Sequence, residues 1–400
     1  MIDTAKKPLY AAVFLMEIAY GLFLIVAGIR VAQAVESPLL LGILSPVHLL
    51  TRVLGNLYFG GLSDRLGRKR LIVTACVMVG LAFLLLVQAN LISTILAFFV
   101  CGLGNSIFWP SVESWIGQKN HGKALMRHLG VFGMAFTIGL GLGSLAGGIL
   151  QKLAPPIGVT FACVVLAGVA VMISLAEDTK EVAASNRPIS PEVPQDHDGK
   201  AADVNPVSRT YCTLGRIANF ATWVTIGDLR FLFPKLCQEM RLSLVLPGEV
   251  NGLLYLCWFF MFFLLTRYNS WTYRPAPLLL FQCLGAAAAL LMGLLPSPGI
   301  FFLAFGLFGF SAGMAYFSSM FYGQDGASDK GKKSGLHEMF LSLGALVGPL
   351  LGGVVAEFTG LRGAFFSAAA VIVIAGGIEL GILRRTGRRE TNRAEVSAHG

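Results

Sequence analysis

Long apolar runs separated by short polar segments form the pattern of this chain. The length of each run is close to that of an α-helix that crosses the hydrocarbon of a bilayer, which needs about 20 residues. Several contain Gly or Pro, which membrane helices tolerate better than soluble helices do. The pattern predicts an all-α membrane protein of twelve transmembrane helices. The twelve runs lie near 9–33, 39–60, 71–89, 92–116, 130–150, 156–175, 212–234, 249–266, 276–295, 299–322, 336–356 and 362–383.

One segment in the middle of the chain differs from everything around it. Residues 176–209 are rich in Pro, Ser, Asp and Ala, and such a segment cannot bury enough apolar surface to order itself. Six apolar runs precede it and six follow it. We therefore predict two six-helix halves joined by a disordered cytoplasmic linker, in the order 1–176 for the N-terminal half, 177–209 for the linker, 210–385 for the C-terminal half and 386–400 for a cytoplasmic tail.

The two predicted halves share a pattern of glycines. Every glycine of the eleventh run has a counterpart 205 positions earlier in the fifth run. Glycines four residues apart lie on one face of a helix and let a neighbouring backbone approach closely. An apolar helix that is merely Gly-rich explains single glycines, but a matched set predicts structural repeats with tight helix contacts. The predicted packing positions are Gly139, Gly143, Gly147, Gly344, Gly348, Pro349 and Gly352.

The balance of charges agrees with a membrane protein. Hydrophobic residues make up 55% of the chain and charged residues 13%, against about 25% charged in an ordinary soluble domain. If the N-terminus is cytoplasmic, 23 Lys and Arg residues lie on the inner side and four in the outer loops. This bias follows the positive-inside rule and predicts that both termini are cytoplasmic in a plasma membrane, the inner membrane of a bacterium. No aromatic residues interleave the basic clusters, so we expect no nucleic-acid partner.

The sequence shows no sign of enzyme chemistry. The seven cysteines form no CxxC pair or metal-ligand spacing and are interpreted as packing residues without disulfides. No Walker loop is present, which argues against an ATP-driven pump. The first run follows Lys6 and Lys7 without a small-residue cleavage site, so we expect it to be a retained helix. We expect a monomer in the bilayer, with no catalytic residues, no metal and no cofactor.

The loop between the second and third runs carries a specific motif. Residues 60–70 read GGLSDRLGRKR, which resembles the G-x-L-[AS]-D-[RK]-x-G-[RK]-[RK] loop of the major facilitator superfamily. The resemblance implies a twelve-helix fold in two halves and secondary transport by alternating access. In that family the loop is thought to latch one conformation. The implied latch residues are Gly60, Asp64, Arg65, Gly67, Arg68 and Lys69.

Elementary chemistry favours the latch over a role in orientation alone. Gly60 and Gly67 permit a sharp turn, and Asp64 can face the positive end of a helix while the basic side chains stay in water. If the basic residues only set orientation, Asp64 and the glycines remain unexplained.

The fifth and eleventh runs resemble a motif of drug and proton antiporters, G-x8-G-x3-G-P-x2-G-G. The eleventh run carries it whole, and Ser144 replaces its Pro in the fifth. Two other antiporter marks are missing, because Phe98 stands where the family places an Arg and the first run lacks Pro-x-x-Pro. The resemblance implies proton-coupled efflux of a small organic solute, with the proton gradient as the energy source. The alternative is a proton-coupled importer or facilitator of a polar or anionic metabolite.

Polar side chains within the runs are the candidates for a binding site. A charge in a bilayer costs several kcal/mol, so it normally faces the interior of the bundle. Glu17 and Arg52 lie near the middle of their runs, which makes an ion pair between them plausible; they either bind substrate and couple protons or form a structural pair. The candidates for one central cavity are Glu17, Tyr20, His48, Arg52, Asn56, Asn105, Trp109, Glu113, Asn219 and Trp223.

Packing remains open as an alternative for several of these residues. A lone His such as His48 is often a packing residue. The rings of Trp109, Trp223 and Trp258 can stack on a flat or cationic ligand or fill the core. Arg30, Asp228 and Arg230 lie nearer the outer face and are predicted to be gate or interface residues. A membrane-embedded enzyme or a sensor without transport is the competing class, which the intact loop around Asp64 argues against.

Overall fold

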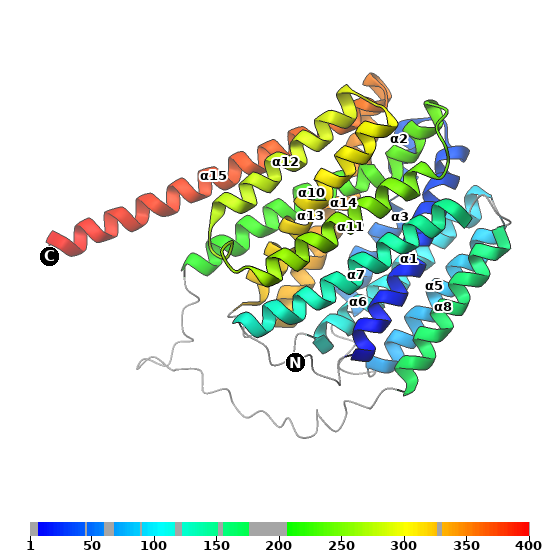
Figure 1. Ribbon diagram of the computed structural model, residues 1–400, viewed down its shortest axis with the longest axis horizontal. Helices are drawn as coiled ribbons and strands as arrows, with labels where there is room; N and C mark the ends of the chain where they lie inside the picture. The colour runs from blue at the N-terminus through cyan, green and yellow to red at the C-terminus, as the bar shows by residue number, and fades with distance from the viewer. Residues whose placement is uncertain are drawn as a thin grey trace.

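The computed structural model describes residues 7–44, 46–59, 68–88, 90–116, 122–150, 155–175, 206–325 and 330–399. Regular structure in these ranges is entirely α-helical, and the helices lie side by side in one bundle (Figure 1). The helices are α1 (Lys7–Ala34), α2 (Pro38–Leu44), α3 (Val47–Phe59), α5 (Arg68–Val87), α6 (Leu91–Ile116), α7 (Gly122–Leu150), α8 (Pro155–Leu175), α10 (Pro206–Glu239), α11 (Leu246–Arg267), α12 (Pro275–Leu294), α13 (Pro298–Gln324), α14 (Lys330–Thr359) and α15 (Arg362–His399).

The prediction of an all-α membrane fold with twelve spans is confirmed. The second predicted span is divided into α2 and α3, and each of the other predicted runs corresponds to one helix. Among the described residues, eleven spans have the length and apolar composition to cross a membrane. The twelfth, α10, is less apolar because it carries Arg216, Asp228 and Arg230. Charges that make a span hard to recognise are also the ones that mark a site.

Several helices extend beyond their predicted boundaries, and two of these differences concern the predicted linker and tail. α10 begins at Pro206, inside the segment predicted to be linker, because the first turn of a helix tolerates Pro well. α15 was predicted to end near 383 but continues to His399, extending away from the bundle as the red helix of Figure 1. Loss of hydropathy after 383 marks the end of the apolar run, whereas Arg, Glu and Ala still favour a helix. Residues 177–205 of the predicted linker lie outside the described residues.

Close backbone contacts hold α7 against α1 and α14 against α10. A Cβ added at Gly139 or Gly143 would meet the carbonyl groups of Phe14 or Ile18 on α1. Gly147 lies against Leu22 in the same way. Glycine permits this close approach of two backbones. Close packing matters between membrane helices because the hydrophobic effect does not drive their association. In the second half, Gly344 faces Phe220, Gly348 faces Val224, Gly352 faces Asp228 and the carbonyl of Pro349 faces Gly42.

Contacts join the two halves at both ends of the bundle. At the end where α1 finishes, Ser37 Oγ donates to Glu357 Oε2 at 2.9 Å, and Lys235 Nζ donates to the Ala32 carbonyl at 3.2 Å. At the opposite end, the Gly122 N–H donates to Asp325 Oδ1 at 3.3 Å. The two halves are therefore in contact at both ends of the bundle in this conformation.

Candidate functional site

A small polar pocket lies at the seam between the two halves. Its volume of about 10 Å³ corresponds to about one water molecule, so this conformation has no room for a larger solute. Helices of both halves contribute side chains, and the lining includes both charged groups and aromatic rings. The lining residues are Glu17, Tyr20, Arg52, Trp109, Phe136, Trp223, Arg230, Tyr316, Glu338 and Leu341.

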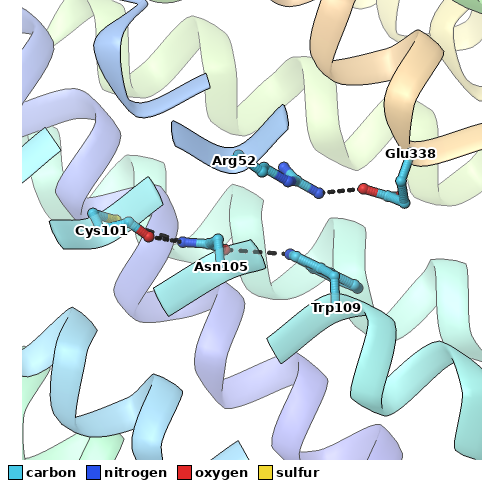
Figure 2. A network of polar contacts seen from close by, with 5 residues as sticks. All are labelled: Arg52, Cys101, Asn105, Trp109 and Glu338. Atoms are coloured by element: carbon cyan, nitrogen blue, oxygen red, sulfur yellow. Dashed lines mark hydrogen bonds and ion pairs between the residues drawn. The ribbon is translucent and has the colours of Figure 1, made fainter. Parts of the chain in front are cut away.

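Arg52 forms an ion pair across the seam. Its guanidinium, on α3, donates to the carboxylate of Glu338 on α14, and both side chains are buried (Figure 2). The predicted pairing of Arg52 with Glu17 is wrong for this conformation. Because α3 packs against α14, the guanidinium meets an acid of the second half before it reaches α1. The Arg52 Cζ also lies 6.0 Å from the centre of the Trp109 ring, which favours the cation further.

Asn105 positions Trp109 from one turn away on α6. Its side-chain nitrogen donates to the Cys101 carbonyl at 3.0 Å, and its oxygen accepts from Trp109 Nε1 at 3.3 Å (Figure 2). Trp109 is thereby oriented while its ring lines the pocket. Asn105 itself was predicted to line the cavity, but the structure places it behind Trp109.

Arg230 lies in the pocket, although its sequence position favoured a gate. The side chain is only 5% exposed, and its Cζ is 5.0 Å from the centre of the Trp223 ring. One nitrogen donates to the Tyr255 hydroxyl at 3.2 Å, whereas Nε and Nη1 have no hydrogen-bond partner among the described residues. In the described part of the chain no carboxylate pairs with this guanidinium. The pocket therefore contains one neutralised arginine and one that is not.

Glu17 is fully buried and lines the same pocket from α1. Neither of its oxygens, nor the neighbouring Tyr20 hydroxyl, has a hydrogen-bond partner among the described residues. Burying a charged group without a partner is costly, and either a proton or a bound ligand can remove that cost. Glu17 is thus the carboxyl of the pocket that remains available for chemistry, because Glu338 is engaged by Arg52.

Three further predicted cavity residues, His48, Asn56 and Asn219, are not among the side chains that line the pocket. His48 packs with the rings of Phe98 and Phe231, each 5.5 Å away between centroids. Asn219 is buried and Asn56 is half-buried, and neither is among the described side chains that line the pocket. Glu113 lies on α6, but its side chain falls outside the described residues.

The two other predicted gate residues lie apart from the pocket. Asp228 is fully buried, and its Oδ1 lies beside Gly352 of α14. Arg30 lines a separate cavity of about 410 Å³ between α1, α5, α6 and α8, and its guanidinium donates to the Leu86 carbonyl.

The predicted latch cannot be placed from this structure. Gly60, Asp64, Arg65 and Gly67 lie outside the described residues, α5 begins at Arg68, and Lys69 is half-buried on that helix.

Sequence reasoning missed Glu338, Phe136 and Tyr316. Glu338 carried a usable signal, because it is an acid near the start of the eleventh apolar run and the rule applied to Glu17 applies equally to it. Phe136 and Tyr316 had none. The chain contains 29 Phe and nine Tyr, and only the packing of helices brings Phe136 and Tyr316 to the pocket.

Comparisons with solved structures agree with this architecture. A human organic anion transporter has a TM-score of 0.68 at 18% identity, with 94% of this chain and all of that chain covered. The nucleoside transporter NupG has a TM-score of 0.64 at 13% identity, covering 95% of this chain and 99% of its own. A bacterial homologue of the human lysosomal transporter Spinster, inward-facing and occupied, has a TM-score of 0.68 at 15% identity, covering 94% and 96%. At these identities the likeness shows the fold alone.

Two curated relatives match a shorter stretch. A Na⁺, Li⁺, K⁺/H⁺ antiporter of Planococcus maritimus is 34% identical over 117 residues, which are 28% of this chain and 28% of that protein. An uncharacterised MFS-type transporter of Methanocaldococcus jannaschii is 30% identical over 117 residues, or 28% and 30% of the two chains. This chain thus matches less than a third of the length of either relative.

The family model described as Major Facilitator Superfamily matches residues 9–332, most of the chain. That match agrees with a bundle of membrane-spanning helices and with the pocket between two halves. The chain belongs to the Major Facilitator Superfamily and is an integral membrane transporter.

Proposed function

We propose that this protein carries a small organic anion and a proton across the membrane in the same direction, by alternating access. The observation that supports this proposal is a pair of charged groups in one buried pocket that have no ion-pair partner among the described residues, Arg230 from the second half and Glu17 from the first. Arg52 is the lesser candidate for the anion because Glu338 already neutralises it.

The direction of coupling follows from charge. An anion bound at Arg230 would share a pocket of buried side chains with Glu17, where like charges repel strongly. Protonation of Glu17 removes that repulsion, so the proton and the anion each favour binding of the other. Positive coupling loads both ligands from the same side and releases both on the other side. The sequence favoured exchange against protons, whereas the charges of the pocket favour cotransport.

Exchange of a cationic solute against protons is the second candidate function. A cationic solute that binds Glu17 would displace its proton, and this competition produces antiport. Two observations favour it: the partial relative named a Na⁺, Li⁺, K⁺/H⁺ antiporter, and the intact glycine motif of α14. The two candidates differ in the sign of proton movement, which can be measured.

The test uses proteoliposomes that contain a trapped pH dye. Methanesulfonate and benzenesulfonate are added outside, because a sulfonate stays ionised and cannot cross lipid as a neutral acid. Cotransport predicts that the lumen acidifies when the anion enters. Glu17→Gln is expected to abolish this acidification and to spare exchange of labelled anion, which needs no net proton movement. Protein-free liposomes are the control.

Two outcomes would contradict the proposal. One is unchanged acidification in Glu17→Gln, which would assign the proton to another group. The other is a lumen that stays at constant pH with anions but becomes alkaline when organic cations enter, which would favour exchange.

A further inference from the structure

We infer that the anion is aromatic: a flat ring that binds between Phe136 and Tyr316, with a single acidic group at Arg230. This inference rests on the proposed function and specifies the substrate class of the same pocket.

Phe136 and Tyr316 form a parallel pair of ring faces across the seam. Their planes differ by 14°, and their centroids are 5.8 Å apart. Phe136 belongs to α7 in the first half and Tyr316 to α13 in the second, and both line the pocket. Parallel faces carried by two different halves form a slot that becomes wider or narrower as the halves move.

Two tryptophans stand across the edge of this slot. The rings of Trp109 and Trp258 are each inclined by 83° to the ring of Phe136, with centroids 5.8 Å away. Aromatic edges are electropositive and faces electronegative, so perpendicular walls around parallel faces suit another flat ring. An aliphatic chain would gain apolar contact here but none of this geometry.

Opening of the transporter makes room for a ring. A flat ring sandwiched between two others needs faces about 7 Å apart, which is two van der Waals contacts of about 3.5 Å. The closed pocket lacks that space. Because alternating access rocks one half against the other, Phe136 and Tyr316 separate without distortion of either half. When the transporter closes on a bound flat ring, the rings of Phe136 and Tyr316 both contact it. A saturated ring is thicker and keeps the rings of Phe136 and Tyr316 further apart.

Arg230 sets the charge of the ligand. Its cation lies over the Trp223 ring, and that ring contacts Trp258 at 6.1 Å and Tyr316 at 6.4 Å between centroids. Because Arg230, Phe136 and Tyr316 line the same pocket, we expect an acidic group attached to the bound ring to meet the guanidinium. Since Glu338 engages Arg52, the pocket provides one available cation and suits a ligand with one negative charge.

The test compares three probes that differ by one property each. Binding of benzoate, cyclohexanecarboxylate and benzamide to the purified full-length protein is measured by titration calorimetry. We expect benzoate to bind about tenfold more tightly than cyclohexanecarboxylate, because each ring face in contact adds a stacking gain. Benzamide has the ring without the charge and is expected to bind at least tenfold more weakly than benzoate.

Variants assign the preference to the slot. Tyr316→Leu and, separately, Phe136→Leu should reduce the preference for benzoate over cyclohexanecarboxylate to less than about threefold. Tyr316→Phe keeps the ring face and should retain the preference, which separates the loss of stacking from the loss of folding.

The outcomes distinguish this inference from the proposed function. Equal affinity for benzoate and cyclohexanecarboxylate, with benzamide weak, would overturn the aromatic class and leave the anion transporter standing. Equal affinity for benzoate and benzamide, or binding of neither acid, would overturn both. A preference for benzoate that survives both leucine variants would overturn the slot.

Discussion

α7 packs on α1 in the first half as α14 packs on α10 in the second. The glycines of α7 and α14 match at intervals of 205 positions, and the carbonyl groups that they meet match at intervals of 206. Even the return contact is repeated, since Gly21 faces the carbonyl of Leu140 and Gly227 faces that of Ala345. The two halves therefore share a backbone scaffold that is specified by small residues.

The chemistry of the pocket is not repeated. Glu17 on α1 corresponds to Trp223 on α10, and the position of Arg230 is held by Leu24 in the first half. One half thus provides a carboxyl and the other a cation, on matching helices that face each other. The comparison shows that the glycines produce the same helix packing in both halves. The residues between the glycines differ, so matching positions carry different charges in the two halves.

The largest expected effect comes from breaking the shared scaffold. Gly143→Leu and Gly348→Leu each place a side chain against backbone that cannot yield, and we expect both to lose at least about 3 kcal/mol of stability. The matched controls are Gly168→Leu and Gly377→Leu, where a Cβ has no other atom within 4 Å; these should stay within about 0.5 kcal/mol.

Thermal unfolding and the yield of monodisperse protein in detergent measure both effects. Wild-type behaviour of Gly348→Leu together with instability of Gly143→Leu would show that the scaffold is not shared between the halves.

The next effect concerns the one described ion pair that joins the two halves. Removing either partner leaves a buried charge without its counterion, so Arg52→Met or Glu338→Leu alone should cost about 3–5 kcal/mol. The double variant removes both charges and should be nearly as stable as the wild type. A double-mutant cycle on chemical unfolding measures the coupling. Additive losses would mean that the pair contributes no specific interaction.

Sequence reasoning predicted the scaffold well because its signals are local. Run length and glycine spacing each depend on positions that are close in the sequence, and run length predicted the twelve spans. The break between α2 and α3 carried only a weak signal, since the second run appears continuous in hydropathy.

The site was less accessible because it is assembled from both halves. Glu17 and Arg52 were correctly selected as polar residues within apolar runs, but which acid meets Arg52 depends on how α3 lies against α14. The position of Arg230 along its helix also led to the wrong prediction that it is a gate residue. A long side chain on a central helix can reach the pocket from a level nearer the membrane surface.

A smaller effect, on rate and not on stability, is expected at the motif loop. The second half has no acid at the matching loop, 265–275, so the proposed latch is one-sided. Asp64→Asn should reduce the rate of benzenesulfonate exchange in proteoliposomes at least about tenfold while expression and thermal unfolding stay unchanged, because the charge acts on one conformation. Ser63→Ala is the matched control. An unchanged rate in Asp64→Asn would remove the latch role.

The smallest effect is expected where the two scaffolds differ by one residue. Pro349 in α14 has Ser144 as its counterpart in α7, where the Ser144 hydroxyl donates to the Leu140 carbonyl at 2.8 Å. Proline inside a helix normally costs about 3 kcal/mol because it removes a backbone donor and clashes with the carbonyl four residues earlier. Here that carbonyl belongs to Leu140, whose counterpart Ala345 already lies four residues before a proline in the same packing arrangement.

If the repeat extends to the backbone, Ser144→Pro should therefore cost less than about 1 kcal/mol of the free energy of unfolding. Thr137→Pro is the matched control, because its counterpart is Ser342 and no proline precedent exists there; it should show the full loss of about 3 kcal/mol. Equal losses in the two variants, measured by chemical unfolding, would limit the repeat to the glycines. Tolerance of Ser144→Pro alone would mean that α7 already has the backbone shape that accommodates a proline in α14, so the difference between the two helices lies in their side chains.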